Sequence, residues 1–224
     1  MKIISLTLFT KNLEKQIAFY KDTLGFQLLD QTENKAIFQV GKSKLIFIGG
    51  KKTHPYHFAL NIPAYLENEA LKWLKKKVSI LKHEKDEIQT FDNWNARAIY
   101  FYDEDKNIVE FISRRNLEEI SMKEFNHKSI QEISEIGISS EDIKHKYEEF
   151  SNNFPIEIYD GDFNIFCAMG SETGLFICVN KFEKTWFPTE DKALPADFSV
   201  IIEVENQEFF VEYEQEKLTI NPIL

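Results

Sequence analysis

The chain has 224 residues, 43% of them hydrophobic and 14% aromatic, which is enough for a packed core and excludes a largely disordered protein. The formal net charge is −10, so the surface repels phosphate backbones and anionic lipids, and we expect neither nucleic acid nor membrane as a partner. The chain shows no signal-peptide pattern and no apolar run of roughly 18 residues, which predicts a cytoplasmic protein.

The first fifty residues predict a strand, a helix and three further strands. Residues 1–10 alternate apolar and polar side chains, and apolar residues then recur at helical spacing over residues 13–24. Asn12 is a suitable N-cap for this helix, and Gly25 is a suitable residue to end it. Residues 26–31, 35–40 and 44–48 are short strand-like runs separated by turn residues. We call this βαβββ segment unit 1.

The same order of elements begins again at residue 56, and we call it unit 2. Its predicted elements are a strand at 57–62, a helix at 67–77, and strands at 79–84, 97–102 and 107–113. Two consecutive units of this kind can place their sheets side by side. We therefore expect units 1 and 2 to form one half-open barrel.

The second half of the chain repeats the pattern. Displaced by 130 positions without a gap, Ser5 falls on Glu135, Leu8 on Ile138 and Leu45 on Leu175, which defines unit 3 over residues 133–179. Unit 4 is degenerate, with strands near 198–204, 208–213 and 217–220 and no helix. The sequence thus predicts an α+β protein of tandem βαβββ modules in half-open barrel sheets. Its two domains are residues 1–115 and a degenerate 130–224, joined by a linker at 116–129.

Strand parity predicts which side chains line the inside of the sheets. The unit 1 helix covers Leu6 and Leu8, so Ser5 lies on the opposite, inner face. By the same parity His57 and Glu110 point inward in unit 2, and we expect their side chains to approach within about 5 Å. A buried carboxylate is costly without a partner or a metal, and this nitrogen and oxygen pair suits Zn, Fe, Mn or Ni.

The first 113 residues resemble the vicinal oxygen chelate superfamily, which includes glyoxalase, bleomycin resistance proteins, fosfomycin thiol transferases and extradiol dioxygenases. The resemblance is carried by residues 5–20, by Leu24-Gly25-Phe26, by Tyr56-His57-Phe58-Ala59 and by the hairpin at residues 99–111. It implies a small-molecule ligand and a divalent metal held by His57, Glu110 and, more weakly, Ser5, with Glu110 also catalytic. The cleft-lining positions that it implies for substrate binding are Thr7, Asn61, Trp94 and Arg97.

Each of these functional interpretations has a simpler structural alternative. His57 and Glu110 can be a hydrogen-bonded pair without a metal, and Arg97 can be part of a surface ion pair. Glu135 and Asp197 occupy equivalent inner positions in units 3 and 4, where solvent-exposed acids are the simpler expectation. Residues 184–189 form an aromatic loop without a counterpart in the first half, and its Trp186 and Phe187 are either a core plug or a ligand wall.

The sequence therefore leaves two functional hypotheses. The first is a metal-dependent lyase, isomerase or ring-cleaving dioxygenase that acts on a small substrate with two adjacent oxygens. The second is a metal-free protein that sequesters a small molecule, as bleomycin resistance proteins do. The pattern is compatible with a monomer or a homodimer. Cys167 and Cys178 lie in apolar strand sequence, so we expect unpaired thiols that react slowly.

Overall fold

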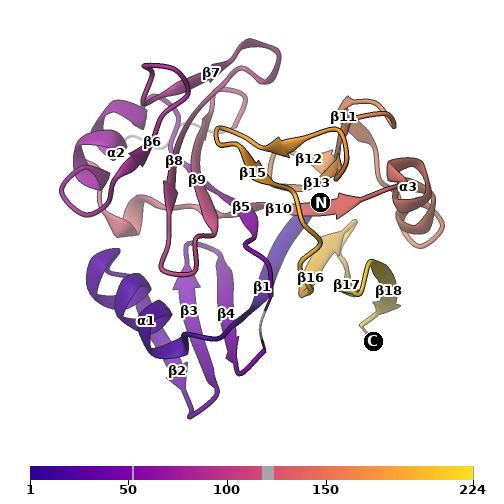
Figure 1. The fold of residues 1–224 in the computed structure, drawn as a ribbon, viewed down its shortest axis with the longest axis horizontal. Coiled ribbons are helices and arrows are strands. Elements are labelled where there is room, and N and C mark those ends of the chain that lie inside the picture. Colours follow the sequence, from indigo (N-terminus) through magenta and orange to yellow (C-terminus); the bar gives the residue numbers. More distant parts are fainter. Residues whose placement is uncertain (52, 118–123, 224) are drawn as a thin grey trace.

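The computed structural model describes residues 1–51, 53–117 and 124–223, which fold into two large open sheets with helices on their outer faces (Figure 1). The α+β class predicted from the sequence is confirmed. Part of the predicted linker, residues 118–123, lies outside the described residues.

The first sheet combines units 1 and 4. Its seven strands run in the order β18-β17-β16-β1-β4-β3-β2. Unit 1 supplies β1 (Lys2–Thr10), α1 (Leu13–Ala18), a π-helical turn (Phe19–Thr23), β2 (Gln27–Gln31), β3 (Lys35–Val40) and β4 (Ser43–Gly49). Unit 4 supplies β16 (Phe198–Val204), β17 (Gln207–Glu214) and β18 (Lys217–Pro222), and no helix is found in this part of the described chain.

The second sheet combines units 2 and 3. Its strands run in the order β11-β12-β13-β10-β5-β9-β8-β6, and β7 also pairs with β8. Unit 2 supplies β5 (His57–Ile62), α2 (Glu67–Leu74), β6 (Ile80–Leu81), β7 (Gln89–Phe91), a 3-10 turn (Asp92–Trp94), β8 (Ala96–Tyr102) and β9 (Ile108–Arg114). Unit 3 follows a 3-10 turn (His127–Ser129) and supplies β10 (Glu132–Ser140), α3 (Ile143–Ser151), β11 (Ile158–Gly161), β12 (Phe166–Ser171) and β13 (Gly174–Asn180).

The pairing of units differs from the sequence-based prediction. We expected units 1 and 2 to share a half-open barrel, but β1 pairs antiparallel with β16, and β5 pairs antiparallel with β10. The first strand of each unit has a free edge that can accept the first strand of any other unit, and strand parity does not tell which one. Both sheets thus contain strands from either side of the predicted linker, and the boundary at 116–129 stays a prediction.

The repeat itself is present, with one correction to its register. Unit 3 has the βαβββ order of unit 1, and β1 and β10 start 130 positions apart, at Lys2 and Glu132. The last strands start 131 positions apart, at Ser43 and Gly174, so one extra residue enters unit 3 after its helix. Both first strands also shift their antiparallel register at equivalent places, between Ile3 and Ser5 and between Ile133 and Glu135. Leu45 therefore corresponds to Phe176, not to Leu175.

A short hairpin between units 3 and 4 crosses the inner face of the second sheet. It contains β14 (Thr185–Trp186) and β15 (Asp191–Lys192), and we call residues 181–193 the strap. Gly137 on β10 makes room for it, because a Cβ atom at this position would lie 2.6 Å from Cη2 of Trp186. A second point of attachment is the Ser139 hydroxyl, which donates a hydrogen bond of 2.6 Å to the carbonyl oxygen of Ala193. The aromatic loop at residues 184–189 therefore packs over the inner face of the second sheet.

Candidate functional site

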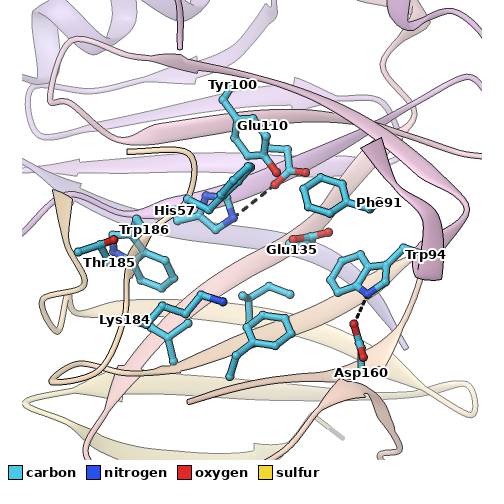
Figure 2. Close-up of a pocket in the computed structure, with 14 residues that line it drawn as sticks. His57, Phe91, Trp94, Tyr100, Glu110, Glu135, Asp160, Lys184, Thr185 and Trp186 are labelled. Carbon is cyan, nitrogen blue, oxygen red and sulfur yellow. Dashed lines mark hydrogen bonds and ion pairs between the residues drawn. The ribbon is translucent and has the colours of Figure 1, made fainter. Parts of the chain in front are cut away.

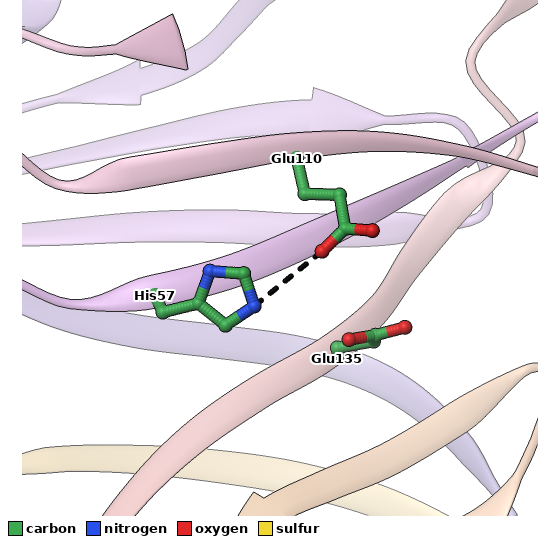
Figure 3. A group of neighbouring side chains, drawn as sticks. All are labelled: His57, Glu110 and Glu135. Atoms are coloured by element: carbon green, nitrogen blue, oxygen red, sulfur yellow. Dashed lines mark ion pairs between the residues drawn. The ribbon is translucent and has the colours of Figure 1, made fainter. Parts of the chain in front are cut away.

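Three titratable side chains meet on the inner face of the second sheet. His57 comes from β5, Glu110 from β9 and Glu135 from β10, and one ligand atom of each lies within 4.8 Å of the others (Figure 3). His57 Nε2 is 3.4 Å from Glu110 Oε2, which confirms that these two residues face one cleft. All three are buried, with exposed fractions of 6%, 3% and 2%.

The strand register explains why these residues meet. Ala59 on β5 lies opposite Glu110 on the parallel neighbour β9 and opposite Glu135 on the antiparallel neighbour β10. The three residues form one row across the sheet, with the smallest side chain in the middle, so the two carboxylates can lean toward each other. His57 lies two positions before Ala59 and therefore projects from the same face.

Burial controls the protonation of this group. It lowers the pKa of His57 to about 4, so the imidazole is neutral near pH 7 and carries a lone pair. Burial raises the pKa of Glu110 well above its usual range, and the charge of Glu135 adds to this effect. Burial likewise raises the pKa of Glu135 to about 7, although the Arg114 guanidinium opposes the shift. The site thus disfavours two bare carboxylates unless a cation joins them.

Arg114 is the cation that the protein itself supplies. Its side chain is fully buried, and Nη2 donates to Oε1 of Glu135 while Nε donates to Oδ1 of Asn61 at 3.3 Å. The guanidinium carbon lies 5.2 Å from the ring centre of Trp94 and 5.9 Å from that of Tyr159. The sequence did not lead us to predict Arg114 at the site, because we expected the strand to end at residue 113. Extending the parity of Ile108, Glu110 and Ile112 by one step would have placed Arg114 on the inner face.

A cavity of about 360 Å³ opens in front of the three donors (Figure 2). Its walls are mainly aromatic, and two of them, Trp186 and Phe187, come from the strap. The ring centres of Trp186 and His57 are 5.4 Å apart, and Trp94 Nε1 donates a hydrogen bond of 2.5 Å to Asp160 Oδ2 at the opposite side. The remaining lining residues are Phe91, Tyr100, Phe166, Ile177, Val179, Lys184 and Thr185.

Ser5 is not one of the residues that the structure brings to this group. It lies on β1 in the other sheet, and it does not line the cavity. The predicted weak ligand therefore fails for a topological reason, since unit 3 and not unit 1 is the neighbour of unit 2. Glu135, the unit 3 counterpart of Ser5, takes its place. The expectation that Glu135 is solvent-exposed is wrong, because only 2% of its surface is accessible.

The other predicted residues lie in different places. Trp94 lines the cavity, whereas Thr7 lies on β1 with Ser5 in the first sheet. Asn61 is buried beside the site and contacts it through Arg114. Arg97 lies outside the cavity. Its half-exposed side chain places Nη1 3.4 Å from Oε1 of Glu67, so it forms an ion pair, as in the alternative interpretation of this residue. Asp197, which immediately precedes β16, forms an ion pair of 2.9 Å with Lys51, which follows β4.

A protein-family model matches the first half of the chain. Residues 2–111 match the model of the Glyoxalase/Bleomycin resistance protein/Dioxygenase superfamily. No curated protein matches the chain. A solved structure, a putative dioxygenase from Bacillus subtilis subsp. subtilis str. 168, is similar over 99% of this chain and 84% of its own, with 14% identity and a TM-score of 0.66. This likeness shows a shared fold that extends over both halves.

Two further solved structures are similar to about half of the chain. Lactoylglutathione lyase from Agrobacterium tumefaciens has 17% identity and a TM-score of 0.43, over 50% of this chain and 92% of its own. The fosfomycin resistance protein FosX from Listeria monocytogenes, in complex with Mn(II) and sulfate, has 20% identity and a TM-score of 0.40, over 50% and 89%. In the described part of the chain, no helix has the length and apolar character needed to cross a membrane.

Proposed function

We propose that the protein, whose residues 2–111 match the model of the Glyoxalase/Bleomycin resistance protein/Dioxygenase superfamily, is a divalent-metal-dependent enzyme of the lyase, isomerase or ring-cleaving dioxygenase type. Its substrate would be a small molecule with two adjacent oxygens. The observation that carries the proposal is the buried group of one histidine and two glutamates, whose ligand atoms lie within 4.8 Å of one another at the wall of a cavity.

The donor set fits a divalent transition metal. A neutral imidazole nitrogen and two carboxylate oxygens suit Zn, Fe(II), Mn or Ni, and three protein ligands leave positions open for a substrate. His57, Glu110 and Glu135 would hold the ion. When bound, it would act as a Lewis acid toward two adjacent substrate oxygens. The cavity in front of the donors provides the space for such a substrate.

The chain's own residues supply the remaining functions. Glu110 lines the cavity and would be ionised beside a bound cation, so its carboxylate would be placed to accept a proton from a substrate. Arg114 holds one oxygen of Glu135 and leaves the other for a ligand role, as hydrogen-bonded partners of metal ligands do. Trp186 and Phe187 of the strap cover the site and reduce the access of water.

One observation favours the second candidate, a metal-free binding protein. Arg114 already neutralises the charge of Glu135, and a protonated Glu110 carboxyl can donate its proton toward Nε2 of the neutral His57. The three buried side chains can therefore be stable without a bound metal ion. Such a protein would use the same aromatic cavity to hold a small molecule without reaction. The two candidates differ in one measurable property, which is the affinity of the buried group for a metal.

Metal titration separates these candidates. Protein purified without an affinity tag and stripped with EDTA is titrated calorimetrically with Mn(II) and with Zn(II). We expect one site per chain in the wild type and at least a tenfold loss of affinity in Glu110→Gln and in Glu135→Gln. Ser5→Ala is the control and should bind like the wild type, since Ser5 lies in the other sheet. A wild-type protein that binds neither metal at millimolar concentration would exclude the enzyme as proposed.

A further inference from the structure

A single lysine side chain lies in the same cavity as the three donors. Lys184 is the residue that precedes β14 on the strap, and its ammonium group points inward from the side of the cavity formed by unit 3 (Figure 2). Nζ lies 4.5 Å from the ring centre of Phe166, so the cation rests against an aromatic face. Burial lowers the pKa of Lys184, because the ammonium group has lost part of its hydration.

No carboxylate compensates this charge directly. Among residues 1–51, 53–117 and 124–223, none forms a salt bridge with Lys184, and the charge of Asp160 only partly opposes the lowering of the Lys184 pKa by burial. The Asp160 carboxylate is occupied elsewhere, since Oδ2 accepts from Trp94 Nε1 at 2.5 Å and Oδ1 accepts from the Gly161 amide at 2.8 Å. A half-buried cation without a close partner is a site for an anion brought by a ligand.

The charges around the cavity agree with an anionic ligand. The acidic side chains at the cavity are Glu110, Glu135 and Asp160. The positive charges are Lys184 in the cavity and Arg114, which lies behind Glu135. With a divalent ion on the three donors and both glutamates ionised, the positive charges exceed the negative charges by one. Burial of a net charge is unfavourable, and a substrate with one negative charge removes it.

The cavity walls between the three donors and Lys184 determine what kind of ligand body fits there. Aromatic surface around the cavity comes from Phe91, Trp94, Tyr100, Phe166 and Phe187, and Ile177 and Val179 add aliphatic surface. These side chains offer few hydrogen-bonding groups to a bound molecule, so they favour a flat, apolar body over a sugar or a peptide.

We propose that Lys184 is the counter-ion for an anionic group of the substrate, and that the substrate class is a small aromatic or apolar acid. Its adjacent oxygens face His57, Glu110 and Glu135, its apolar body lies between the aromatic walls, and its carboxylate or equivalent anion meets Lys184. Two parts of this proposal rest on the proposed function: the placement of the adjacent oxygens and the excess of positive charge, both of which need a bound divalent ion. The pairing of the anion with Lys184 does not require a metal.

Matched acid and amide probes test this pairing. Calorimetric titrations compare 3,4-dihydroxybenzoate with the neutral 3,4-dihydroxybenzamide on Mn(II)-loaded protein, and benzoate with benzamide on EDTA-treated protein. The variants are Lys184→Met, which removes the charge and keeps an unbranched apolar chain, and Lys184→Arg, which keeps the charge. Lys192→Met on β15 is the matched control, because this lysine is exposed on the same strap.

We expect wild-type protein to bind the acid at least about tenfold more tightly than the amide in one or both forms, as a charged hydrogen bond provides. Lys184→Met should remove that preference and leave the affinity for the amide unchanged, whereas Lys184→Arg and Lys192→Met should keep it. Equal binding of acid and amide by the wild type, binding of neither, or an unchanged preference in Lys184→Met would overturn the proposal. If the protein takes up no metal, the enzymatic proposal fails, and the benzoate pair still tests Lys184.

Discussion

The Arg114 guanidinium donates from Nη2 to Oε1 of Glu135, and this contact joins the last strand of unit 2 to the first strand of unit 3. Both side chains are almost completely buried. Because β5 separates β9 from β10, the pair spans a strand and fixes how the two units face each other at the candidate metal site. A buried ion pair adds little stability by itself, but the loss of one partner leaves a bare charge in the interior.

The Arg114→Met variant should therefore lose about 3–5 kcal/mol of unfolding free energy in the absence of metal at pH 9, where Glu135, with its pKa of about 7, is ionised beside Arg114 in the wild type. The methionine fills much of the space but leaves Glu135 without its cation. Urea denaturation of EDTA-treated protein measures the loss. The double variant Arg114→Met/Glu135→Gln should be more stable than Arg114→Met alone, since it removes the uncompensated carboxylate. Additive effects of the two substitutions would show that the contact contributes no coupling energy.

The close packing of Trp186 against Gly137 gives a second prediction. In Gly137→Ala, the new methyl group would overlap Cη2 of Trp186, so the strap must move or the sheet must bend. We expect a loss of about 1–3 kcal/mol and a red shift of tryptophan fluorescence as Trp186 becomes more exposed. In a Trp186→Leu background the same alanine should cost much less. An equal cost in both backgrounds would place the clash somewhere other than the strap.

Much of the fold could be predicted because periodicity and repeats are local properties. The alternation of Ser5 to Leu8 and the helical spacing after Leu13 identify the βαβββ order, and unit 3 repeats it. The pairing of units could not be predicted in this way. Whether β5 lies beside β1 or β10 depends on contacts between segments far apart in the chain, and every first strand has the same pattern of inward and outward residues.

The candidate site shows the same division. His57 and Glu110 lie in one unit, so parity alone placed them on one face, and their side chains do approach each other. Glu135 comes from another unit, and its role could be seen only once β10 was known to pair with β5. Ser5 was chosen by the same parity and failed because its unit pairs elsewhere. Lys184 lies on a hairpin outside the repeat, where no periodic pattern indicates which way a side chain points.

The two cysteines provide a third prediction. Cys167 on β12 and Cys178 on β13 are register neighbours, and the structure confirms that both thiols are free and buried. Burial raises the pKa of Cys167 to about 11 and raises that of Cys178 further above its usual range. Because the thiolate is the reactive form, we expect labelling by a disulfide reagent at pH 8 to be very slow in native protein and complete in urea. Rapid labelling of native protein would contradict their placement in the sheet.

The last prediction concerns Asp103, which lies in the turn between β8 and β9. Its carboxylate is buried and accepts hydrogen bonds from the side chains of Gln16 at 3.1 Å, Tyr20 at 2.9 Å and Asn107 at 2.8 Å. The first two belong to the helical segment of unit 1, so this one carboxylate ties unit 1 to unit 2. Burial raises its pKa to about 6, although the hydrogen bonds oppose that shift.

The sign of the pH effect follows from the raised pKa. The folded protein binds the Asp103 proton more tightly than the unfolded chain, so this stabilisation is complete below the unfolded pKa of about 3.8 and is lost as the pH rises through about 6. We expect wild-type unfolding free energy to fall by up to about 3 kcal/mol relative to Asp103→Asn between pH 4 and pH 7. Other groups of the site titrate in both proteins, so the difference between them isolates Asp103.

The variant Tyr20→Phe makes this test more specific. It removes one hydrogen bond that favours the ionised carboxylate, so the pKa of Asp103 in the folded protein should rise above its wild-type value. The midpoint of the stability difference from Asp103→Asn, measured by urea denaturation across this pH range, should then move upward. A midpoint that stays in place, or a wild-type curve parallel to that of Asp103→Asn, would show that Asp103 does not titrate as its burial requires.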